Sequence, residues 1–324
     1  MSRTALILGV TGQDGAYLTR FLASKDYTIH GTSRDADMAR LGGLTALGVR
    51  ERVQLHSVSP TDFRSVLQAI ERVEPDEIYN LSGQSSVALS FAQPRETMDS
   101  IVSGTLNILE ALRVLGGNIR FYNAGSSEIF GDTGTRAADE GTAFRPKSPY
   151  GVAKAAAVSL VANYRESYAL FACSGLLFNH ESPLRPERFV TRKITAAAAR
   201  IASGGSERLR LGNLALSRDF GWAPEYVVAM WTMLDQQTPD DFIIASGKAH
   251  TLEEFVAAAF GEVGLDWKQH VDFDTAFSRP SDIAHSLGEA GKAARLLGWK
   301  PSVKFTDIVK RMVRGEREGA AAIL

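Results

Sequence analysis

The sequence predicts an α/β protein built on a doubly wound parallel sheet, and three observations support this prediction. Apolar, β-branched runs alternate with segments of helical period through the first half of the 324 residues. These runs are apolar on both faces, which is typical of strands that helices cover on either side. A glycine-rich turn, residues 9–15, joins the first run to the first helical segment. Together they indicate a Rossmann-type sheet.

Each element of this sheet follows from its local sequence. The apolar runs predict strands over 4–10, 27–32, 53–57, 77–81, 119–124 and 171–178. Helices are expected between them, over about 14–25, 62–73, 94–115 and 150–168. Strands that alternate with helices are joined by crossover connections, so they are expected to pair in parallel.

The character of the sequence changes at Asn179, where a polar, proline-broken stretch over 181–188 follows the last predicted strand of the sheet. Beyond it we expect a helix over 190–203, a strand over 242–245, and a helix that opens with the capping-box spacing of Thr251 and Glu254. The prediction is a dinucleotide-binding domain over 1–178 and a smaller C-terminal α/β substrate domain over 179–324. Segments of about 212–245 are expected to return to the first domain.

Composition limits the class of partner. With 36 Lys and Arg against 37 Asp and Glu, the net charge is -1, so no global attraction to nucleic acid or anionic lipid is expected. No apolar stretch approaches the ~20 residues of a membrane-spanning helix. The single cysteine, Cys173, lies in a predicted apolar strand and is expected to pack in the core. One cysteine cannot form an internal disulfide, which is typical of a protein in a reducing compartment, so the predicted location is the cytoplasm. The six histidines show no ligand spacing, and no metal is expected.

The glycine-rich turn is the predicted cofactor site. It has the spacing G-x-x-G-x-x-G at a strand-to-helix junction, where the backbone can approach a pyrophosphate and free N–H groups of the helix can bind it. The residues predicted to contact the cofactor there are Gly9, Thr11, Gly12, Gln13, Asp14 and Gly15.

The end of the second strand bears on the choice of nicotinamide cofactor. A basic residue there favours the 2′-phosphate of NADP, and an acidic one the ribose hydroxyl of NAD. Arg34 precedes Asp35, which favours NADP and leaves NAD as the alternative. In another interpretation the two side chains simply pair on a solvated turn.

A catalytic unit is predicted where the fifth strand meets a later helix. Tyr150 and Lys154 are four residues apart and share a helix face, so the ammonium can stabilise a tyrosinate and lower its pKa. Ser126 follows the strand and can hydrogen-bond the substrate oxygen that loses its proton. This is an acid/base unit for hydride transfer between a sugar carbinol and a nicotinamide. The Tyr/Lys spacing alone is common in ordinary helices. It indicates a catalytic pair here because the glycine turn, the serine after the strand and the sheet pattern accompany it.

The chain resembles the extended short-chain dehydrogenases/reductases, and within them the GDP-mannose 4,6-dehydratases. The resemblance covers nearly the whole chain, and its most specific strings are 179–183 and 190–195. Further matching strings lie at 9–15, 80–87, 163–168, 211–214, 279–280 and 297–301.

The resemblance implies a lyase that makes a 4-keto-6-deoxy sugar by internal hydride transfer. Tyr150 would take the O4 proton while hydride leaves C4 for NADP, with Ser126 and Lys154 assisting. Glu128 would then take the C5 proton and assist loss of the C6 hydroxyl, after which hydride returns to C6. A 4-ketoreductase or epimerase of the same fold would not need Glu128, which in that case is a capping or surface carboxylate.

The resemblance also implies binding residues and an assembly. Leu81, Tyr150 and Lys154 would join the cofactor site, and the GDP-sugar would be bound by Ser85, Asn179, Lys193, Asn213, Arg218, Arg279 and Asp282. Arginines suit a diphosphate because they bind it bidentately. His180 is expected to be a structural hydrogen-bonding residue. The alanine-rich helix from Tyr150, with the helix near 94–115, would form a homodimer, with a tetramer as the alternative.

Several binding positions depart from the family pattern. Asp35 replaces one of two arginines, and Val58-Ser59-Pro60 replaces Gly-Asp-Leu. The Ser-Pro-Arg-Arg-Gly loop has become Ser-Pro-Leu-Arg-Pro over 182–186, and Ala215 and Asp282 replace an aspartate and a glutamate. The catalytic residues are kept. This pattern leaves open a dehydratase for another sugar such as GDP-manno-heptose, and a catalytically idle cofactor-binding protein.

Overall fold

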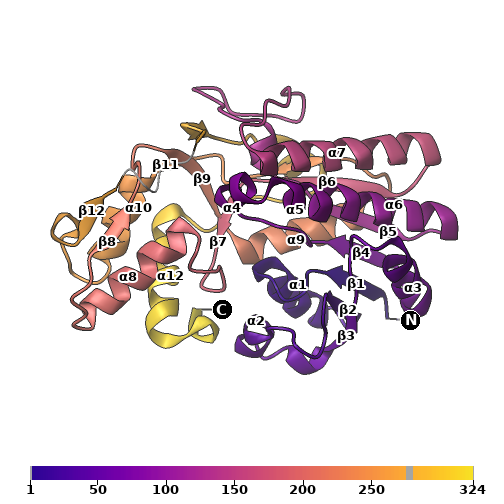
Figure 1. Cartoon of the computed structure of the whole chain (residues 1–324), viewed down its shortest axis with the longest axis horizontal. Coiled ribbons are helices and arrows are strands. Elements are labelled where there is room, and N and C mark those ends of the chain that lie inside the picture. The colour runs from indigo at the N-terminus through magenta and orange to yellow at the C-terminus, as the bar shows by residue number, and fades with distance from the viewer. Residues whose placement is uncertain (1, 275–279, 324) are drawn as a thin grey trace.

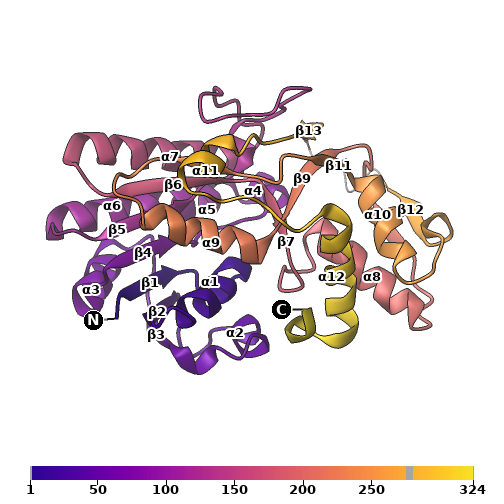
Figure 2. The same ribbon diagram turned by 180° about the vertical axis from the view of Figure 1, so that it is seen from behind.

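A parallel sheet forms the centre of the larger lobe of the molecule (Figures 1 and 2). The computed structural model describes residues 2–274 and 280–323. The sheet has seven strands in the order β10-β6-β5-β4-β1-β2-β3, and every neighbouring pair is parallel. The strands are β1 Thr4–Leu8, β2 Thr28–Ser33, β3 Val53–Ser57, β4 Glu77–Asn80, β5 Arg120–Ala124, β6 Ala172–Leu177 and β10 Phe242–Ile244. The predicted fold class and all six predicted strands of the first half are confirmed.

Helices cover both faces of the sheet, which explains why the strands are apolar on both sides. Along β1, Leu6 and Leu8 belong to one core cluster, whereas Ala5 and Ile7 belong to another. The first cluster lies under α3, α6 and α7, and the second under α1 and α9. These helices are α1 Gln13–Ala23, α3 Phe63–Val73, α6 Gly104–Leu115, α7 Pro149–Tyr168 and α9 Ala223–Leu234.

The helix predicted over 94–115 is not one uninterrupted α-helix. It consists of α5 Pro94–Met98, the π-helical turn η2 Asp99–Ser103, and α6. Within η2, the Ser100 hydroxyl accepts a hydrogen bond from the backbone N–H of Gln84 at 3.2 Å. Apolar periodicity does not reveal such a turn, because it inserts only one residue into a helical pattern.

The smaller lobe is built mainly from the second half of the chain. A four-stranded sheet joins β7 Asn179–Glu181, β9 Ser217–Trp222, β11 Ala249–Thr251 and β13 His285–Ser286. A two-stranded sheet pairs β8 Leu209–Leu211 with β12 Val271–Phe273. Its helices α8 Val190–Ala202, α10 Leu252–Gly261 and α12 Phe305–Glu318 enclose a separate apolar core. The capping box predicted at the start of α10 is present.

One later segment of the chain lies with the larger lobe. Helix α9 packs against α1, and β10 extends the parallel sheet beside β6. Trp231 in α9 donates a hydrogen bond to the Tyr27 hydroxyl at 2.9 Å. The domain division at 178/179 stays a prediction.

The remaining elements are short and were not predicted. They are α2 Gly42–Ala46, α4 Val87–Ala92, α11 Gly291–Leu296, and the 3₁₀ turns η1 Arg50–Arg52, η3 Ser127–Ile129, η4 Trp267–Gln269 and η6 Ala320–Ile323. Among all the helices described, none is both long and apolar enough to span a membrane.

Candidate active site

A large pocket lies at the carboxyl ends of the parallel strands, between the two lobes. Its walls include residues that directly follow β1, β2, β3, β4, β5 and β6, together with residues of α8 and β9. This edge is where open α/β sheets bind ligands. The cavity measures about 1480 Å³, more than the ~300–1,000 Å³ usual for one drug-sized ligand. There is room for two nucleotide-containing molecules.

The glycine-rich turn forms one end of this pocket. Gly9 has a φ of 84°, and a Cβ there would lie 2.7 Å from the Leu81 carbonyl oxygen. A Cβ on Gly15 would lie 2.6 Å from the carbonyl oxygen of Gly9. The N-cap residue of α1 is Gly12, which has no side chain to accept a hydrogen bond from the first backbone N–H groups of the helix. These residues fit the pyrophosphate of a dinucleotide, which needs close backbone approach and free N–H donors.

Side chains of α1 join the glycine turn to β7 and the loop after it. Gln13 donates to the His180 carbonyl at 3.2 Å and accepts from the Ser182 hydroxyl at 2.7 Å. The Asp14 carboxylate lies 3.0 Å from Nε2 of His180, whose Nδ1 lies 2.8 Å from the Phe178 carbonyl oxygen. The hydrogen-bonding role predicted for His180 is therefore seen, and its ring also lines the pocket.

The His180 ring has an acceptor at each nitrogen. Burial lowers the pKa of His180, but the Asp14 carboxylate and the Phe178 carbonyl outweigh it and the net shift is upward. Burial raises the pKa of Asp14, but the charge and hydrogen bond of His180, together with Gln13 and Arg185, outweigh it and the net shift is downward. Each side chain of the pair therefore favours the charged form of the other.

The end of β2 keeps its two charged side chains apart. The Asp35 carboxylate accepts the backbone N–H groups of Asp37 and Met38 at 3.0 and 3.1 Å. Arg34 is exposed, lines the pocket, and forms no ion pair with any residue in the described ranges. The interpretation in which Arg34 and Asp35 pair with each other is not seen in this structure.

Ser126, Tyr150 and Lys154 come together where β5 meets α7. The Ser126 hydroxyl caps η3 and also hydrogen-bonds the buried Tyr150 phenol. Tyr150 sits in the first turn of α7, which Ser148 caps through the Gly151 N–H at 3.0 Å. One turn later, the Lys154 ammonium donates to the Ala124 carbonyl at 2.7 Å and lies 5.9 Å from the centre of the Tyr150 ring.

The pKa values of this trio are set mainly by burial. Burial raises the pKa of Tyr150 to about 12, and the hydrogen bond from Ser126 opposes the rise. Burial lowers the pKa of Lys154 to about 8. The predicted lowering of the tyrosine pKa is therefore not seen, because desolvation of the phenol outweighs the opposing effects of Ser126 and Arg185.

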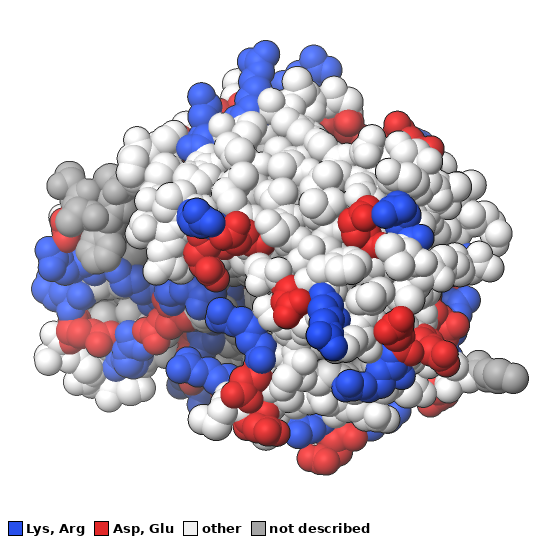
Figure 3. All heavy atoms as spheres, turned by 45° about the vertical axis from the view of Figure 1, so that its right-hand side comes forward, with Lys and Arg blue, Asp and Glu red and all other residues white. Residues whose placement is uncertain are grey.

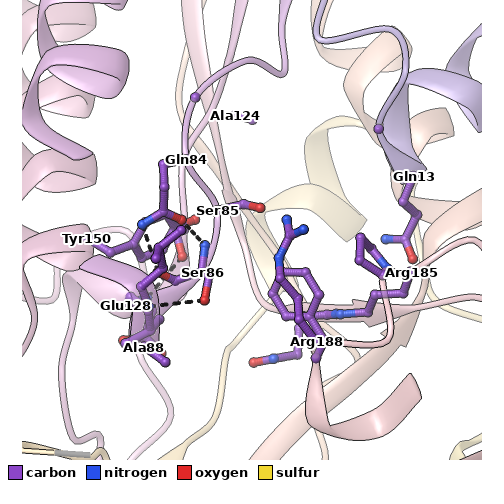
Figure 4. Close-up of a pocket in the computed structure, with 18 of the residues that line it drawn as sticks. Gln13, Gln84, Ser85, Ser86, Ala88, Ala124, Glu128, Tyr150, Arg185 and Arg188 are labelled. Atoms are coloured by element: carbon purple, nitrogen blue, oxygen red, sulfur yellow. Dashed lines mark hydrogen bonds between the residues drawn. The ribbon is translucent and has the colours of Figure 1, made fainter. Parts of the chain in front are cut away.

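Glu128 lies beside this trio in the same pocket. Figure 4 shows its side chain near those of Tyr150, Ser86 and Ala88. Gly151 permits this arrangement, because a Cβ there would lie 2.8 Å from the Glu128 carbonyl oxygen. The charge of Glu128 adds to the upward shift of the Tyr150 pKa, so the two side chains are electrostatically coupled. The Glu128 carboxylate and the Tyr150 phenol therefore line the same part of the pocket, where one bound substrate could contact both.

Comparison with known proteins identifies the family. The family model described as GDP-mannose 4,6 dehydratase matches residues 6–312. GDP-mannose 4,6 dehydratase 2 of Arabidopsis thaliana is 46% identical over 98% of this chain and 87% of its own length. The human GDP-mannose 4,6 dehydratase is 40% identical over 97% of this chain and 91% of its own length. The chain belongs to the GDP-mannose 4,6-dehydratase family.

Solved structures support the fold of this family member. A UDP-glucose 4-epimerase from Thermus thermophilus, in complex with NAD, superposes with a TM-score of 0.86 at 23% identity, covering 97% of this chain and 99% of the other. A dTDP-glucose 4,6-dehydratase from Streptomyces venezuelae, with NAD and TYD bound, gives 0.87 at 20% identity, covering 97% of each chain. At these identities the likeness concerns the fold alone.

Six of the seven residues predicted to bind the GDP-sugar line the same pocket. Ser85, Asn179, Lys193, Asn213, Arg218 and Asp282 all line it. Several also make internal contacts: Arg218 pairs with Asp282 at 3.3 Å, and Lys193 donates to the Arg210 carbonyl at 2.7 Å. Arg279 lies outside the described residues.

The pocket also contains cations that the sequence did not single out. Arg185, Arg188 and Arg210 line it, and the first two lie over the ring of Phe189 at 4.3 and 5.0 Å from its centre. Figure 4 shows Arg185 and Arg188 entering the pocket from the loop after β7. The sequence shows that the loop over 182–188 departs from the family pattern. It does not show that the loop enters the pocket, because the position of the loop depends on hydrogen bonds from Arg192 of α8.

No metal centre is evident in the described part of the chain, where no three His, Cys, Asp or Glu side chains gather to hold an ion. The expectation that the protein needs no metal stays a prediction.

Proposed function

We propose that this protein is a GDP-mannose 4,6-dehydratase, which converts a GDP-hexose to its 4-keto-6-deoxy derivative by internal hydride transfer. The observation that carries the proposal is Glu128, which faces the same volume as Ser126, Tyr150 and Lys154. The elimination step needs a second acid/base group that simple ketoreduction does not need. The match of the family model over residues 6–312 supports the same conclusion.

The chain's own residues have distinct roles in this proposal. Ser126 holds the O4 oxygen, and Tyr150, as its tyrosinate, accepts the O4 proton and becomes a phenol. The Lys154 ammonium stabilises the tyrosinate before this transfer, which the raised pKa of Tyr150 makes necessary. A nicotinamide bound here would supply the hydride acceptor for C4 and the hydride donor for C6. Glu128 removes the C5 proton and passes it to the departing C6 hydroxyl, which leaves as water. The proton that Tyr150 took from O4 is then available to return to C5 when C6 is reduced.

NADP is the proposed cofactor, with NAD as the alternative. The support comes from Arg34, whose exposed guanidinium lines the pocket while Asp35 is held in its own turn. A guanidinium at this position suits a 2′-phosphate. Gly9, Thr11, Gly12, Gln13, Asp14, Gly15 and Leu81 would form the rest of the cofactor site. NADP binding that is unchanged in Arg34→Ala would contradict this assignment.

The diphosphate of the sugar nucleotide is proposed to lie among the cations of the smaller lobe. Lys193, Arg210 and Arg218 come from α8, β8 and β9, so they converge on the pocket from three elements. Asn179 and Asn213 supply neutral polar groups beside them. Guanidinium and ammonium groups in this arrangement suit a diphosphate.

The assembly is proposed to be a homodimer through α7 and its neighbours. Between Pro149 and Tyr164, α7 has only one charged residue, Lys154, and it is buried. Val152 is exposed on this helix, and Ala156 is half-buried. Figure 3 shows a broad area without charged side chains on this side of the molecule. Such a surface favours self-association. A cytoplasmic location is proposed because Cys173 is buried and free.

The decisive experiment is incubation of the pure protein with GDP-mannose and catalytic NADP⁺, followed by mass spectrometry of the sugar nucleotide. The expected product is lighter by one water, with no net accumulation of NADPH. A product of unchanged mass would indicate an epimerase. Net conversion of the added NADP⁺ to NADPH, with a sugar lighter by two hydrogens, would indicate a ketoreductase running in the oxidative direction. If GDP-mannose is untouched, GDP-manno-heptose is the next substrate to test, and failure of all sugars would favour an idle binding protein.

A further inference from the structure

The loop over 182–188 carries two arginines into the pocket, but its own position depends on a helix at the far end of the chain. The loop lies between β7 and α8, and Arg185 and Arg188 project from it. The Arg185 guanidinium donates to the His180 carbonyl at 2.9 Å and to the buried Glu181 carboxylate at 2.7 Å. Its Nε is buried without a partner among the described residues.

A second arginine, Arg192 of α8, holds the backbone of this loop. Its Nη1 donates to the carbonyl oxygens of Pro183 and Arg185, the latter at 3.0 Å. These two bonds fix the loop on either side of Leu184. Arg192 itself is only 24% exposed.

Glu316 of α12 holds Arg192 in turn. Its two carboxylate oxygens accept from Nε and Nη2 of Arg192, the second at 3.0 Å, which is a bidentate pair. Glu316 also accepts from the Thr195 hydroxyl at 3.2 Å and is 10% exposed. All three guanidinium nitrogens of Arg192 are therefore occupied, two by the carboxylate and one by the loop.

We infer that the Glu316–Arg192 pair is a positioning device that sets the loop over 182–188 so that Arg185 and Arg188 reach phosphate groups of the bound nucleotides. The inference rests on the proposed function, because it assumes that the pocket binds phosphorylated ligands. Neither residue lines the pocket, so both act through the loop. The phosphates are those of the nicotinamide dinucleotide or of the GDP-sugar, since residues of both predicted sites border the loop.

The charge on Glu316 should matter more than the shape of its side chain. In Glu316→Gln the amide keeps one acceptor, but its NH₂ group faces a guanidinium that cannot accept a hydrogen bond. Arg192 is then held less firmly, and the two loop carbonyls lose a fixed donor. A loop that samples other positions binds anions less tightly because it must be ordered on binding.

The matched control lies two residues further along the same helix. Glu318 pairs with Arg314 at 2.7 Å on the solvent side, with both side chains about half exposed. Glu318→Gln removes the same charge from α12 without touching the loop. Any effect of charge on α12 itself is therefore common to both variants.

The experiment measures binding as well as turnover. NADPH binding is followed by fluorescence and GDP binding by calorimetry, with kcat and KM for GDP-mannose alongside. Glu316→Gln is expected to weaken binding of at least one of the two ligands by about tenfold, the effect of losing a well-placed bond to a charged group. KM is expected to rise while kcat stays within about twofold. Glu318→Gln should match the wild type.

Unchanged affinity for both NADPH and GDP in folded Glu316→Gln would overturn the inference, as would a fall in kcat with unchanged binding. If that variant does not fold, Arg192→Lys replaces it, because lysine keeps the charge but cannot hold two carbonyls and a carboxylate together. The same weakened binding is expected from it, and wild-type affinity would again overturn the inference. Failure of the proposed function would look different, because the wild type would then not turn over GDP-mannose.

Discussion

Lys154 shows how burial tunes a single catalytic residue. It is 7% exposed, and burial lowers its pKa to about 8 although the Asp14 carboxylate opposes the shift. The ammonium therefore loses its proton within an accessible pH range. Because only the charged form can stabilise a tyrosinate, the proposed chemistry depends on this proton.

Tyr150 must be a tyrosinate to accept a proton and its pKa is raised to about 12, so kcat should rise by about tenfold per pH unit while Lys154 stays charged and should level off as pH passes about 8. Arginine stays charged throughout, so any activity left in Lys154→Arg should keep rising above this pH. The measurement is a kcat profile from pH 6 to 10, with protein integrity checked by circular dichroism. A wild-type profile that keeps rising up to pH 10 would remove the proposed role of the ammonium.

Glu128 is the residue that separates elimination from plain oxidation. In Glu128→Gln we expect dehydration to fall by about 10²–10⁴-fold, because the amide cannot take the C5 proton. Oxidation at C4 should survive, so NADPH should accumulate up to the amount of enzyme. Rapid-mixing absorbance and mass spectrometry of the sugar follow the two steps. Turnover equal to that of the wild type would assign the chain to the epimerase or reductase alternative.

Among the elements, β2 and β3 at the edge of the sheet carry a histidine pair that sequence periodicity does not reveal. Nδ1 of His30 lies 2.8 Å from Nε2 of His56, and the rings stack with centres 5.1 Å apart. One nitrogen must donate and the other accept, so at least one ring is neutral. Burial lowers the pKa of both, with the charge of His56 adding to the shift of His30 and that of Arg72 to the shift of His56.

This pair predicts a loss of stability in acid. A lowered pKa in the folded state means that the unfolded chain binds more protons, so the free energy of unfolding falls as pH drops below about 6.5, the ordinary histidine value. Urea denaturation at pH 7.5 and 5.5 measures the change. His56→Gln should give a smaller loss between these two pH values. An identical pH dependence in that variant would show that other groups cause the loss.

At the same scale, the helix predicted over 94–115 illustrates the limit of periodicity. Its apolar face was recognised, but the π turn was not. The turn lies where Ser100 meets the Gln84 backbone, a contact between segments that are far apart in the sequence. Local pattern therefore located the helix, and tertiary contacts determined its internal geometry.

For the whole molecule, the charge-free side of α7 predicts self-association. Val152 is 45% exposed in the middle of this surface. Replacing it with arginine would bury a charge in a dimer interface, which is strongly unfavourable. We expect the wild type to sediment as a dimer and Val152→Arg as a monomer at micromolar concentration. Leu296→Arg, at a 60% exposed position on α11, is the control. A Val152→Arg protein that remains dimeric would place the interface elsewhere.

The sequence by itself determined the fold class, the glycine turn and the Tyr150/Lys154 spacing. These features depend on neighbours within a few residues, through periodic burial, backbone freedom at Gly9 and one helical turn. The family strings could be recognised for the same reason. The resemblance to the family assigned roles to Ser126 and Glu128, which follow a predicted strand. In a parallel sheet of this kind, ligands bind at the carboxyl ends of the strands.

Only the tertiary structure decided how distant segments complete the site. It paired His180 with Asp14 and held the loop of Arg185 through Glu316, more than one hundred residues away along the chain. It also set the pKa of Lys154. Desolvation and buried ion pairing are sums over everything packed around a group, and such sums cannot be obtained from a local stretch of sequence.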